Sequence, residues 1–311
     1  MHIRTNKTLN ILLHPLVWAA EWMGVHHPLT LMRLRYFARF HRPLRINPPR
    51  TLNEVIIFLS LKTDTSLWTL CSDKYRVREY VKQCGLENIL VKLYGVWKKA
   101  EDIDFDSLPD RFVLKGNHGC GDILLVNAKN QIDKDAVVKT YSRDLRKRYG
   151  AIEAGLHYLR IEPCVIAEEL LEIDEETKKY SSVLTDYKIW CFNGKPHFVW
   201  ICNNRHGEHK EVMLYDTEWN MHPEYLIYDS EYVEGAPIPK PNNLEEMLDV
   251  AAKLSEPFPE VRCDLYNTDG RIYFGELTFT GYGGLMTHYT EDFQQLAGSL
   301  IDLSSVKIIE R

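Results

Sequence analysis

The sequence predicts an α+β fold in which antiparallel sheets follow an N-terminal helical segment. Two dipeptides of the hairpin-turn type, Asn193-Gly194 and Asp269-Gly270, each separate runs of β-branched and aromatic residues. Because a tight turn joins antiparallel neighbours, we expect the strands on either side of each dipeptide to pair. Before these hairpins, residues 51–61 show the apolar spacing of a helix behind a capping signal.

The composition is that of a globular chain. Its 311 residues are 45% hydrophobic and 26% charged, enough to bury one large core or a few smaller ones. The formal net charge of −6 argues against a generally nucleic-acid-binding surface, and we expect no nucleic acid partner. The seven cysteines are scattered without a C-x-x-C pair, which argues against a disulfide framework or a zinc site and favours a reducing, cytoplasmic location.

Residues 1–50 combine apolar and aromatic residues with five closely spaced arginines, Arg33, Arg35, Arg39, Arg42 and Arg45. No apolar run here reaches membrane-spanning length, so we expect no transmembrane helix. Basic amphipathic helices can bind anionic membranes, which would place the protein at the inner face of the membrane. The alternative is a helical cap that packs on the main domain. A Pro-Pro pair at 48–49 ends the segment near residue 50.

The next stretch, residues 51–111, predicts two helices and a strand. Thr51 and Glu54 have the spacing of a capping box for a helix over 51–61, and a second helix is expected after Ser72. The aromatic and β-branched residues of 90–97 predict a strand. An acidic loop over 102–109 connects this strand to the stretch that begins at Phe112.

The stretch from Phe112 to Gly121, FVLKGNHGCG, places a lysine where a short apolar strand enters a glycine-rich loop. Glycines let the backbone approach an anion, and successive N–H groups in such a turn form a nest for phosphate oxygens. Lys115 adds a positive charge. The alternative is a hairpin turn with a surface lysine, because the pattern matches neither the P-loop nor the dinucleotide-binding motif. A strand over 123–126 and a charged helix from about 134 to 149 follow.

Residues 163–171, PCVIAEELL, predict a strand that ends in carboxylates and leucines. Such an exit can offer an acceptor for the exocyclic amine of a purine, a backbone N–H for a ring nitrogen, and apolar faces for the base. The alternative is an exposed acidic loop. In the hairpin over 186–204, Lys188 faces either an anionic ligand or solvent.

The last informative stretch, 261–284, predicts two antiparallel strands around Asp269-Gly270. Alternation puts Arg262 and Asp264 on one face of the first strand, and Glu276 and Thr278 on one face of the second. If the hairpin brings these faces together, Asp264 and Glu276 offer the hard oxygen ligands that Mg2+ prefers. The alternative is a charged pair facing solvent, although burying two carboxylates without a cation is costly.

Together these motifs resemble the ATP-grasp superfamily, and within it the teichuronopeptide-biosynthesis (TupA-like) branch. The motifs are SDKYRVREYV, FVLKGNHGCG, DYKIWCFNGKP and VRCDLY...IYFGELTFT, and the resemblance covers roughly residues 45–303. It implies an ATP-grasp fold, in which two antiparallel sheets hold ATP between them. The divisions we expect are an N-terminal basic helical segment (1–50), an N-terminal subdomain (51–111), a lid with the glycine loop (112–170) and a C-terminal catalytic subdomain (171–311).

The resemblance also implies site residues, by motif position. The candidate catalytic residues are three cations, Lys115, Lys188 and Arg262. The expected ATP contacts are Lys74, Lys115, Gly116, Asn117, His118, Gly119, Gly121, Glu168, Glu169, Leu170, Leu171, Glu175, Glu176 and Lys188, with Glu168 to Leu171 at the adenine and Glu175 or Glu176 at the ribose. Asp264, Glu276 and Thr278 are the expected Mg2+ ligands. In the wider superfamily the last strand has Glu-x-Asn, so Thr278 makes the third ligand a hydroxyl or removes it.

The activity that the resemblance implies is ATP-dependent ligation. A carboxylate attacks the γ-phosphate of ATP, and an amine captures the acyl phosphate that forms. The substrates would be small-molecule or glycan carboxylates and amines, in the assembly of surface polysaccharides or glycopeptides. Two alternatives stay open, namely a glycan-modifying transferase on the same fold and a nucleotide-binding scaffold without turnover.

Overall fold

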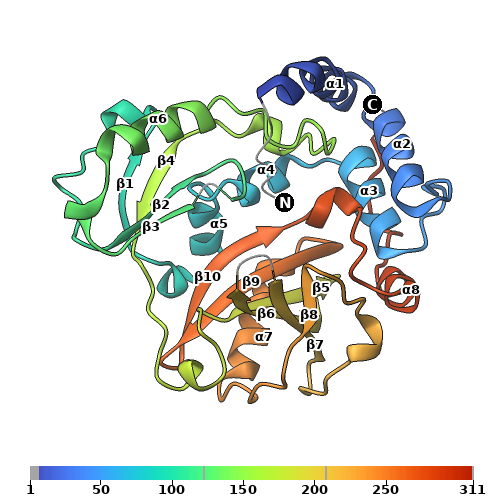
Figure 1. Ribbon diagram of the computed structural model, residues 1–311. Helices are drawn as coiled ribbons and strands as arrows, with labels where there is room; N and C mark the ends of the chain where they lie inside the picture. The colour runs from blue at the N-terminus through green and yellow to red at the C-terminus, as the bar shows by residue number, and fades with distance from the viewer. Residues whose placement is uncertain (1–6, 122, 207–208, 310–311) are drawn as a thin grey trace.

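The computed structural model describes residues 7–121, 123–206 and 209–309, and of residues 7–14 and 205–206 only the backbone (Figure 1). The chain opens with two helices, α1 (Lys7–His26) and α2 (Pro28–Phe40). Proline suits the first position of α2, because its missing N–H would have no partner there. On α2, Met32 and Tyr36 are buried against Ile57 of the next helix, so one face of α2 belongs to the core, as expected of a helical cap. Among the described residues, no helix has both the length and the apolar character needed to cross a bilayer.

The third helix, α3 (Leu52–Lys62), begins at the predicted capping box. The Thr51 hydroxyl accepts from the Glu54 N–H, and the Glu54 carboxylate accepts from the Thr51 N–H. After α4 (Ser66–Ser72), the predicted second helix is delayed until α5 (Val77–Gln83). The reason is Asp73, whose carboxylate accepts from the N–H groups of Tyr75 and Arg76 and holds a turn in front of the helix.

The smaller sheet has four antiparallel strands, in the order β1-β4-β2-β3. These are β1 (Leu93–Trp97), β2 (Phe112–Gly116), β3 (Ile123–Val126) and β4 (Val165–Glu168). The predicted lid begins at residue 112 and so leaves out β1, yet β1 pairs with β4 in the same sheet. Helix α6 (Lys134–Asp144) packs on this sheet through Tyr141 and ends earlier than the predicted helix.

The larger sheet has the order β10-β9-β5-β6-β7-β8. Its strands are β5 (Asp186–Phe192), β6 (Lys195–His206), β7 (His209–Asp216), β8 (Tyr232–Glu234), β9 (Glu260–Thr268) and β10 (Arg271–Thr278). All neighbours are antiparallel except β7 and β8, so this sheet is mixed at one edge. Both predicted hairpins are present. Their turn residues Asn193, Gly194, Asp269 and Gly270 all have φ between 50° and 74°, as a type I′ turn requires.

Helix α7 (Leu244–Ser255) covers one face of the larger sheet and buries Met247, Ala251 and Leu254 there. Helix α8 (Glu291–Ser299) lies against α3. Short 3-10 helices connect the elements: η1 (Glu87–Ile89), η2 (Ala100–Asp102), η3 (Lys129–Gln131), η4 (Tyr158–Arg160), η5 (Thr177–Lys179), η6 (Pro223–Tyr225) and η7 (Gly281–Gly284).

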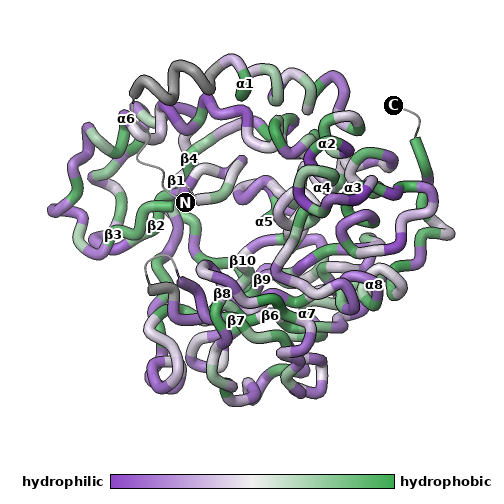
Figure 2. Tube along the Cα trace, turned by 45° about the vertical axis from the view of Figure 1, so that its right-hand side comes forward, coloured by the Kyte–Doolittle hydropathy of each residue, from purple (hydrophilic) through white to green (hydrophobic). Residues whose placement is uncertain are grey.

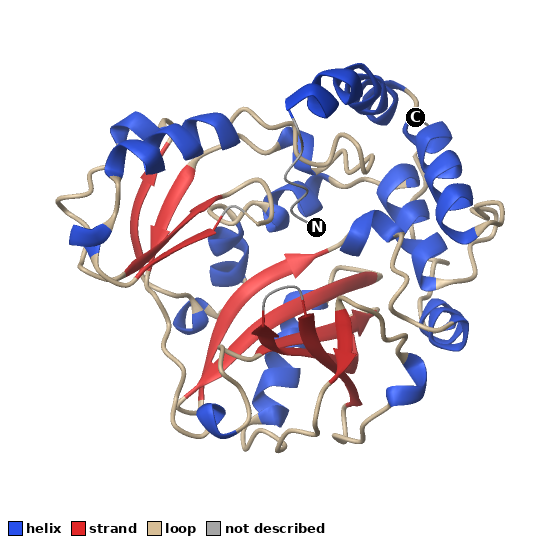
Figure 3. Cartoon of the chain, viewed as in Figure 1, coloured by secondary structure: helices blue, strands red, loops and turns tan. Residues whose placement is uncertain are grey.

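The two sheets lie on opposite sides of the middle of the molecule, with α4 and α5 between them (Figures 1 and 3). The larger sheet is apolar toward α7, where its strands contribute most of the main core. Its other face points toward the smaller sheet and carries charged side chains. This polar face between the sheets is where the site is built.

Candidate active site

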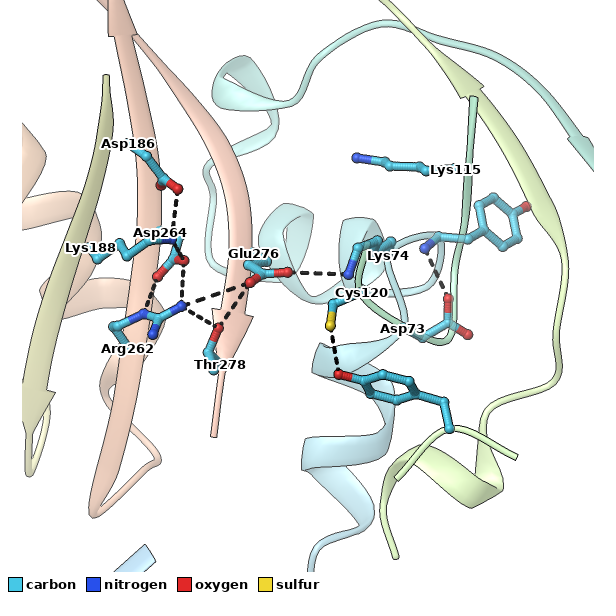
Figure 4. Close-up of polar contacts among 12 residues, drawn as sticks. Asp73, Lys74, Lys115, Cys120, Asp186, Lys188, Arg262, Asp264, Glu276 and Thr278 are labelled. Carbon is cyan, nitrogen blue, oxygen red and sulfur yellow. Dashed lines mark hydrogen bonds and ion pairs between the residues drawn. The ribbon is translucent and has the colours of Figure 1, made fainter. Parts of the chain in front are cut away.

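Three neighbouring strands of the larger sheet present charged side chains on one face (Figure 4). The ladder pairs Lys188 of β5 with Asp264 of β9, and Asp264 with Glu276 of β10. Paired residues in a sheet share a face, so these side chains meet. Asp186 and Arg262 lie on the same face, each two residues from a member of the pair. The predicted meeting of Asp264 and Glu276 is therefore present.

Asp264 is the centre of a buried ion network. Arg262 binds it through two hydrogen bonds, from Nε to Oδ1 and from Nη2 to Oδ2, each 2.7 Å long. Lys188 Nζ lies 2.5 Å from Asp264 Oδ2 and 2.6 Å from Asp186 Oδ2. Because three of the groups are buried and the Lys188 side chain is only 11% exposed, each charge depends on its partners for stabilisation. Asp264 therefore does not face solvent, as the alternative in the sequence analysis required.

Glu276 is held by cations from two directions. Lys74 Nζ lies 3.2 Å from Glu276 Oε2, and Arg262 Nη2 lies 3.9 Å from Oε1, which also accepts a hydrogen bond from Thr278. Burial opposes ionisation of the carboxyl, but Lys74, Lys188 and Arg262 outweigh it and hold the pKa of Glu276 well below its usual range. The carboxylate is thus ionised at any physiological pH.

Lys74 is positioned by the glycine-rich loop. Its N–H donates to the Asn117 carbonyl at 3.0 Å, and the Asn117 amide in turn donates to Asp73 and to the Glu162 carbonyl. Asn117 Oδ1 accepts from the Cys164 N–H at 2.7 Å. We predicted Asn117 as an ATP contact, but its side chain is engaged in these internal hydrogen bonds. It joins the loop to the Asp73 turn.

On the smaller sheet, Lys115 forms an ion pair with Glu168 at 2.5 Å, and Arg78 contacts the other oxygen of the same carboxylate at 3.3 Å. Figure 4 shows Lys115 extending into the space between the two sheets. Glu168 itself is buried, at 4% exposure. The predicted adenine-binding carboxylate therefore anchors Lys115 in this structure.

The glycine-rich loop lines the site through Gly119, Cys120 and Gly121. Gly119 packs so closely on the Tyr149 ring that an added Cβ would lie 3.2 Å from it, and Gly121 has a φ of +85°. Both positions therefore favour glycine. The Tyr149 hydroxyl donates to Cys120 Sγ at 2.9 Å. His118 is buried beside Gly116, away from the pocket-lining surface.

A pocket of about 630 Å3 opens between the loop and the charged face. Its walls combine cations, aromatic rings and glycines: Arg35, Ser72, Lys74, Gly119, Cys120, Gly121, Tyr149, Gly150, Glu153, Tyr158, Lys188, Trp200, Cys202, Lys210, Tyr232, Arg262, Glu276, Leu277, Thr278, Thr280, Gly281, Tyr282 and Gly283. A pocket of this size and mixed chemistry is typical of a small-molecule site. Burial raises the pKa of the Tyr158 phenol to about 12, so this side chain stays neutral near pH 7.

The remaining predicted residues lie at the strand exit after β4. The Glu169 N–H donates to the Lys92 carbonyl at 2.9 Å, which continues the edge contact with β1, and Leu170 and Leu171 are half-buried. Glu175 and Glu176 are exposed and pair with Lys178 and Lys179 one turn along. The structure does not bring these two carboxylates to the pocket.

The sequence analysis missed several residues of the site. Asp186, in the ion network, could have been found, since it lies two positions before Lys188 in an alternating strand. Arg35 enters from α2, and Trp200 and Tyr232 enter from strands β6 and β8, far away in the chain. Only the packing of these elements brings them together.

The oxygen atoms of three side chains are of the type that Mg2+ prefers as ligands. Asp264 and Glu276 offer carboxylate oxygens from opposed positions, and Thr278 offers a hydroxyl 3.1 Å from Glu276 Oε1. Within the described part of the chain, no group of three or more His, Cys, Asp or Glu residues is placed to hold a metal. An ion bound here would need further ligands, such as the phosphates of a substrate.

Comparisons with solved structures find similar chains among ligases. The L-amino acid ligase from Bacillus licheniformis matches with a TM-score of 0.48 and 13% identity, over 93% of this chain and 64% of that one. The D-alanine–D-alanine ligase from Bacillus anthracis gives 0.47 and 15%, over 81% and 71%. Its ATP complex gives 0.40 and 17%, over 70% of this chain, which spans only 56% of that ligase.

A comparison with curated proteins found no match. A family model described as TupA-like ATP-grasp matches residues 54–302, most of the chain. The predicted fold, with two sheets facing a central site behind an N-terminal helical segment, is confirmed by this match and by the architecture. The chain belongs to the TupA-like ATP-grasp family.

Proposed function

We propose that this protein is an ATP-dependent carboxylate–amine ligase that forms a C–N bond through an acyl phosphate. The observation that carries the proposal is a group of three cations at the wall of the pocket, Lys74, Lys188 and Arg262, which converge on the carboxylates of Glu276 and Asp264. Phosphoryl transfer to a carboxylate brings two anions together. A dense group of cations beside a pocket suits that requirement.

In this proposal the nucleotide lies between the two sheets. Lys115 extends from the smaller sheet and Lys188 from the larger, so their ammonium groups approach the phosphates from opposite sides. The glycine-rich loop closes over the phosphates and limits access of water, which protects an acyl phosphate from hydrolysis. Bound Mg2+, held by Asp264, Glu276 and the Thr278 hydroxyl, would neutralise phosphate charge.

Two bond changes follow. In the first, an oxygen of the substrate carboxylate forms a bond to the γ-phosphorus, and the bond to the bridging oxygen of ADP breaks. In the second, the amine attacks the acyl carbon, phosphate leaves, and the amine loses a proton. Arg262 supports the first step, because it lines the pocket and its guanidinium, held in place by Asp264, presents a fixed positive charge to the developing anion.

The substrates that we propose are a small-molecule or glycan carboxylate and an amine, in the assembly of surface polysaccharides or glycopeptides. Lys210 and Arg35 line the pocket beside the aromatic rings of Trp200 and Tyr232, which supports an anionic substrate with apolar faces. We place the reaction in the reducing cytoplasm, because all seven cysteines, six of them at least half-buried, have free thiols.

A screen of carboxylates and amines tests the reaction. A ligase releases ADP and phosphate only when both substrates are present, and hydroxylamine in place of the amine traps the acyl phosphate as a hydroxamate. Lys188→Met should abolish both the release of ADP and phosphate and the formation of hydroxamate. Lys98→Met should abolish neither, because Lys98 is an exposed lysine on the smaller-sheet side.

The alternatives give different products. ADP release without any hydroxamate, together with a modified glycan, would favour the glycan-modifying transferase. ATP binding without hydrolysis across the whole screen would favour the nucleotide-binding scaffold. Either result would contradict the ligase.

A further inference from the structure

The two N-terminal helices expose a concentration of large apolar side chains. Among the described residues, thirteen such side chains are exposed, and six of them lie between positions 16 and 37. We call these six the α1–α2 surface: Leu16, Val17, Trp18, Trp22, Leu34 and Phe37, each 44% to 66% exposed. The chain has seven tryptophans, and its two exposed ones are both here. Such a concentration indicates a surface with a binding partner.

The exposed positions continue from one helix to the other. On α1, Trp18 and Trp22 are one turn apart, and the Trp22 ring lies 5.2 Å from that of His27 at the junction with α2. On α2, Leu34 and Phe37 are again one turn apart. Figure 2 shows both helices at the rim of the molecule. The opposite face of α2 is buried, so the exposed residues are not needed to hold the helix in place.

The charge of this segment is opposite to that of the rest of the chain. Residues 1–50 contain eight of the 38 Lys and Arg residues but one of the 44 Asp and Glu residues, a net charge of +7. The remaining 261 residues contain 30 and 43, a net charge of −13. A basic segment on an otherwise acidic protein directs that segment, and only that segment, toward an anionic surface.

We propose that the α1–α2 surface binds peripherally to a bilayer that contains anionic lipids. Tryptophan favours the boundary between headgroups and acyl chains, because its ring is apolar and its N–H is polar. Exposed arginines on the same segment, Arg33 and Arg45, contact anionic headgroups. This combination of an apolar face with basic residues characterises helices that lie in the membrane interface.

Binding would bring the pocket to the membrane. Arg35 lines the pocket and lies on the side of α2 away from Arg33 and Phe37, since residues two apart on a helix point in widely different directions. The thickness of one helix, about 10 Å, therefore separates the lipid surface from the substrate site. This inference rests on the exposed helices alone and does not depend on the proposed ligase activity.

Sedimentation of the full chain with vesicles tests the proposal. We expect binding to vesicles of phosphatidylcholine with about one third phosphatidylglycerol, weak binding to pure phosphatidylcholine, and release by salt. Replacing both Arg33 and Arg45 by serine should weaken binding about 25-fold, at about fivefold for each arginine near an anionic surface. Arg35 and Arg42 are kept, because they pair with Glu153 and Glu291.

The apolar contribution needs its own variant. Trp18→Ser combined with Phe37→Ser should abolish binding, whereas Leu125→Ser, at 59% exposure on edge strand β3, should leave it unchanged. Circular dichroism checks that each variant is folded. Equal binding to both vesicle types, or binding that neither pair of substitutions reduces, would overturn the proposal. So would a stable dimer in light scattering that the tryptophan and phenylalanine substitutions dissociate, because the surface would then bind a second copy of the chain.

Discussion

Glu276 lies opposite Asp264 because the pairing of β9 and β10 shifts register at Gly275. Next to the turn, Arg271 pairs with Thr268, and Phe274 pairs with Leu265. An unbroken ladder would then place Gly275 opposite Asp264, and Glu276 opposite Cys263, whose thiol faces Ala251 of α7. One bulge therefore moves the Glu276 carboxylate from the apolar side of the sheet to the site.

The bulge predicts a special role for Gly275. A Cβ at this position would lie 2.8 Å from the Asp264 carbonyl oxygen, a backbone atom that cannot move away cheaply. Gly275→Ala should therefore displace Glu276 and lower ATP turnover by about tenfold or more, with a lower Tm. Gly270→Ala is the control, since no atom lies within 4 Å of its added Cβ. At a φ of +70° it should cost about 1 kcal/mol of stability but retain turnover. Normal turnover in Gly275→Ala would contradict the argument.

Removing charge from either metal-binding candidate should raise the Mg2+ requirement. Glu276→Gln keeps the shape of the side chain, so we expect the Mg2+ concentration for half-maximal rate to rise about tenfold or more. The Tm should also fall, because Lys74, Lys188 and Arg262 stabilise the charged form of the carboxyl. Asp264→Asn should have the same effect on Mg2+ and in addition lose about 3 to 5 kcal/mol of stability, because it removes the charge that buried Arg262 binds through two hydrogen bonds and one of the two carboxylates that pair with Lys188. Unchanged metal titrations in both variants would remove β9 and β10 from the site.

Lys115→Ala should weaken ATP binding. The side chain extends into the space between the sheets, and a charge-assisted hydrogen bond to phosphate contributes about 1.5 to 3 kcal/mol, or roughly a ten- to hundredfold change in Kd. Glu168 keeps Arg78 as a partner in the variant, so the sheet should remain folded. Calorimetric titration with a non-hydrolysable ATP analogue measures the effect, with the exposed Lys98→Ala as the control. Equal affinities would show that Lys115 is not a phosphate ligand.

Nucleotide binding should protect two separate segments from hydrogen exchange. The loop over 115–121 and the strand exit over 167–172 lie on the smaller sheet, and a ligand between the sheets would bridge both to the larger one. We expect slower exchange in both segments with an ATP analogue and Mg2+. Protection limited to the first 50 residues would place the nucleotide elsewhere.

Glu260 should reduce stability as the pH rises. It is fully buried, and neither of its carboxylate oxygens has a hydrogen-bond partner among the described residues, so burial raises the pKa of the carboxyl well above its usual value. Below the unfolded pKa both states are protonated, and Glu260 has no pH-dependent effect. Above that pKa only the unfolded state releases the proton readily, so stability falls by up to about 1.4 kcal/mol per pH unit until the raised folded pKa is reached.

Thermal unfolding of Glu260→Gln measures this contribution. The variant should match wild type near pH 4 and exceed it increasingly toward pH 7, because glutamine cannot ionise. A constant difference between the two proteins across this range would show that Glu260 is not held neutral.

Local signals in the sequence were sufficient for much of the fold and for the polar face of the site. The capping box at Thr51, both type I′ turns and the strand over 123–126 depend on neighbouring residues, and all are present. Strand alternation likewise put Arg262 with Asp264 on one face and Glu276 with Thr278 on one face, and the structure confirms both pairs. A period of two residues is a local property, so the sequence alone reveals it.

Contacts between distant segments were decided by the tertiary structure. Lys74 meets Glu276 across 202 positions, Asn117 ties the loop to Asp73, and Arg35 enters the pocket from a helix that shows no sign of it in the sequence. Glu175 and Glu176, expected at a ribose, instead pair with neighbouring lysines. The sequence determined which side chains could bind phosphate and metal. Packing of separate elements, together with one register shift at Gly275, decided which of them meet, because neither depends on local periodicity.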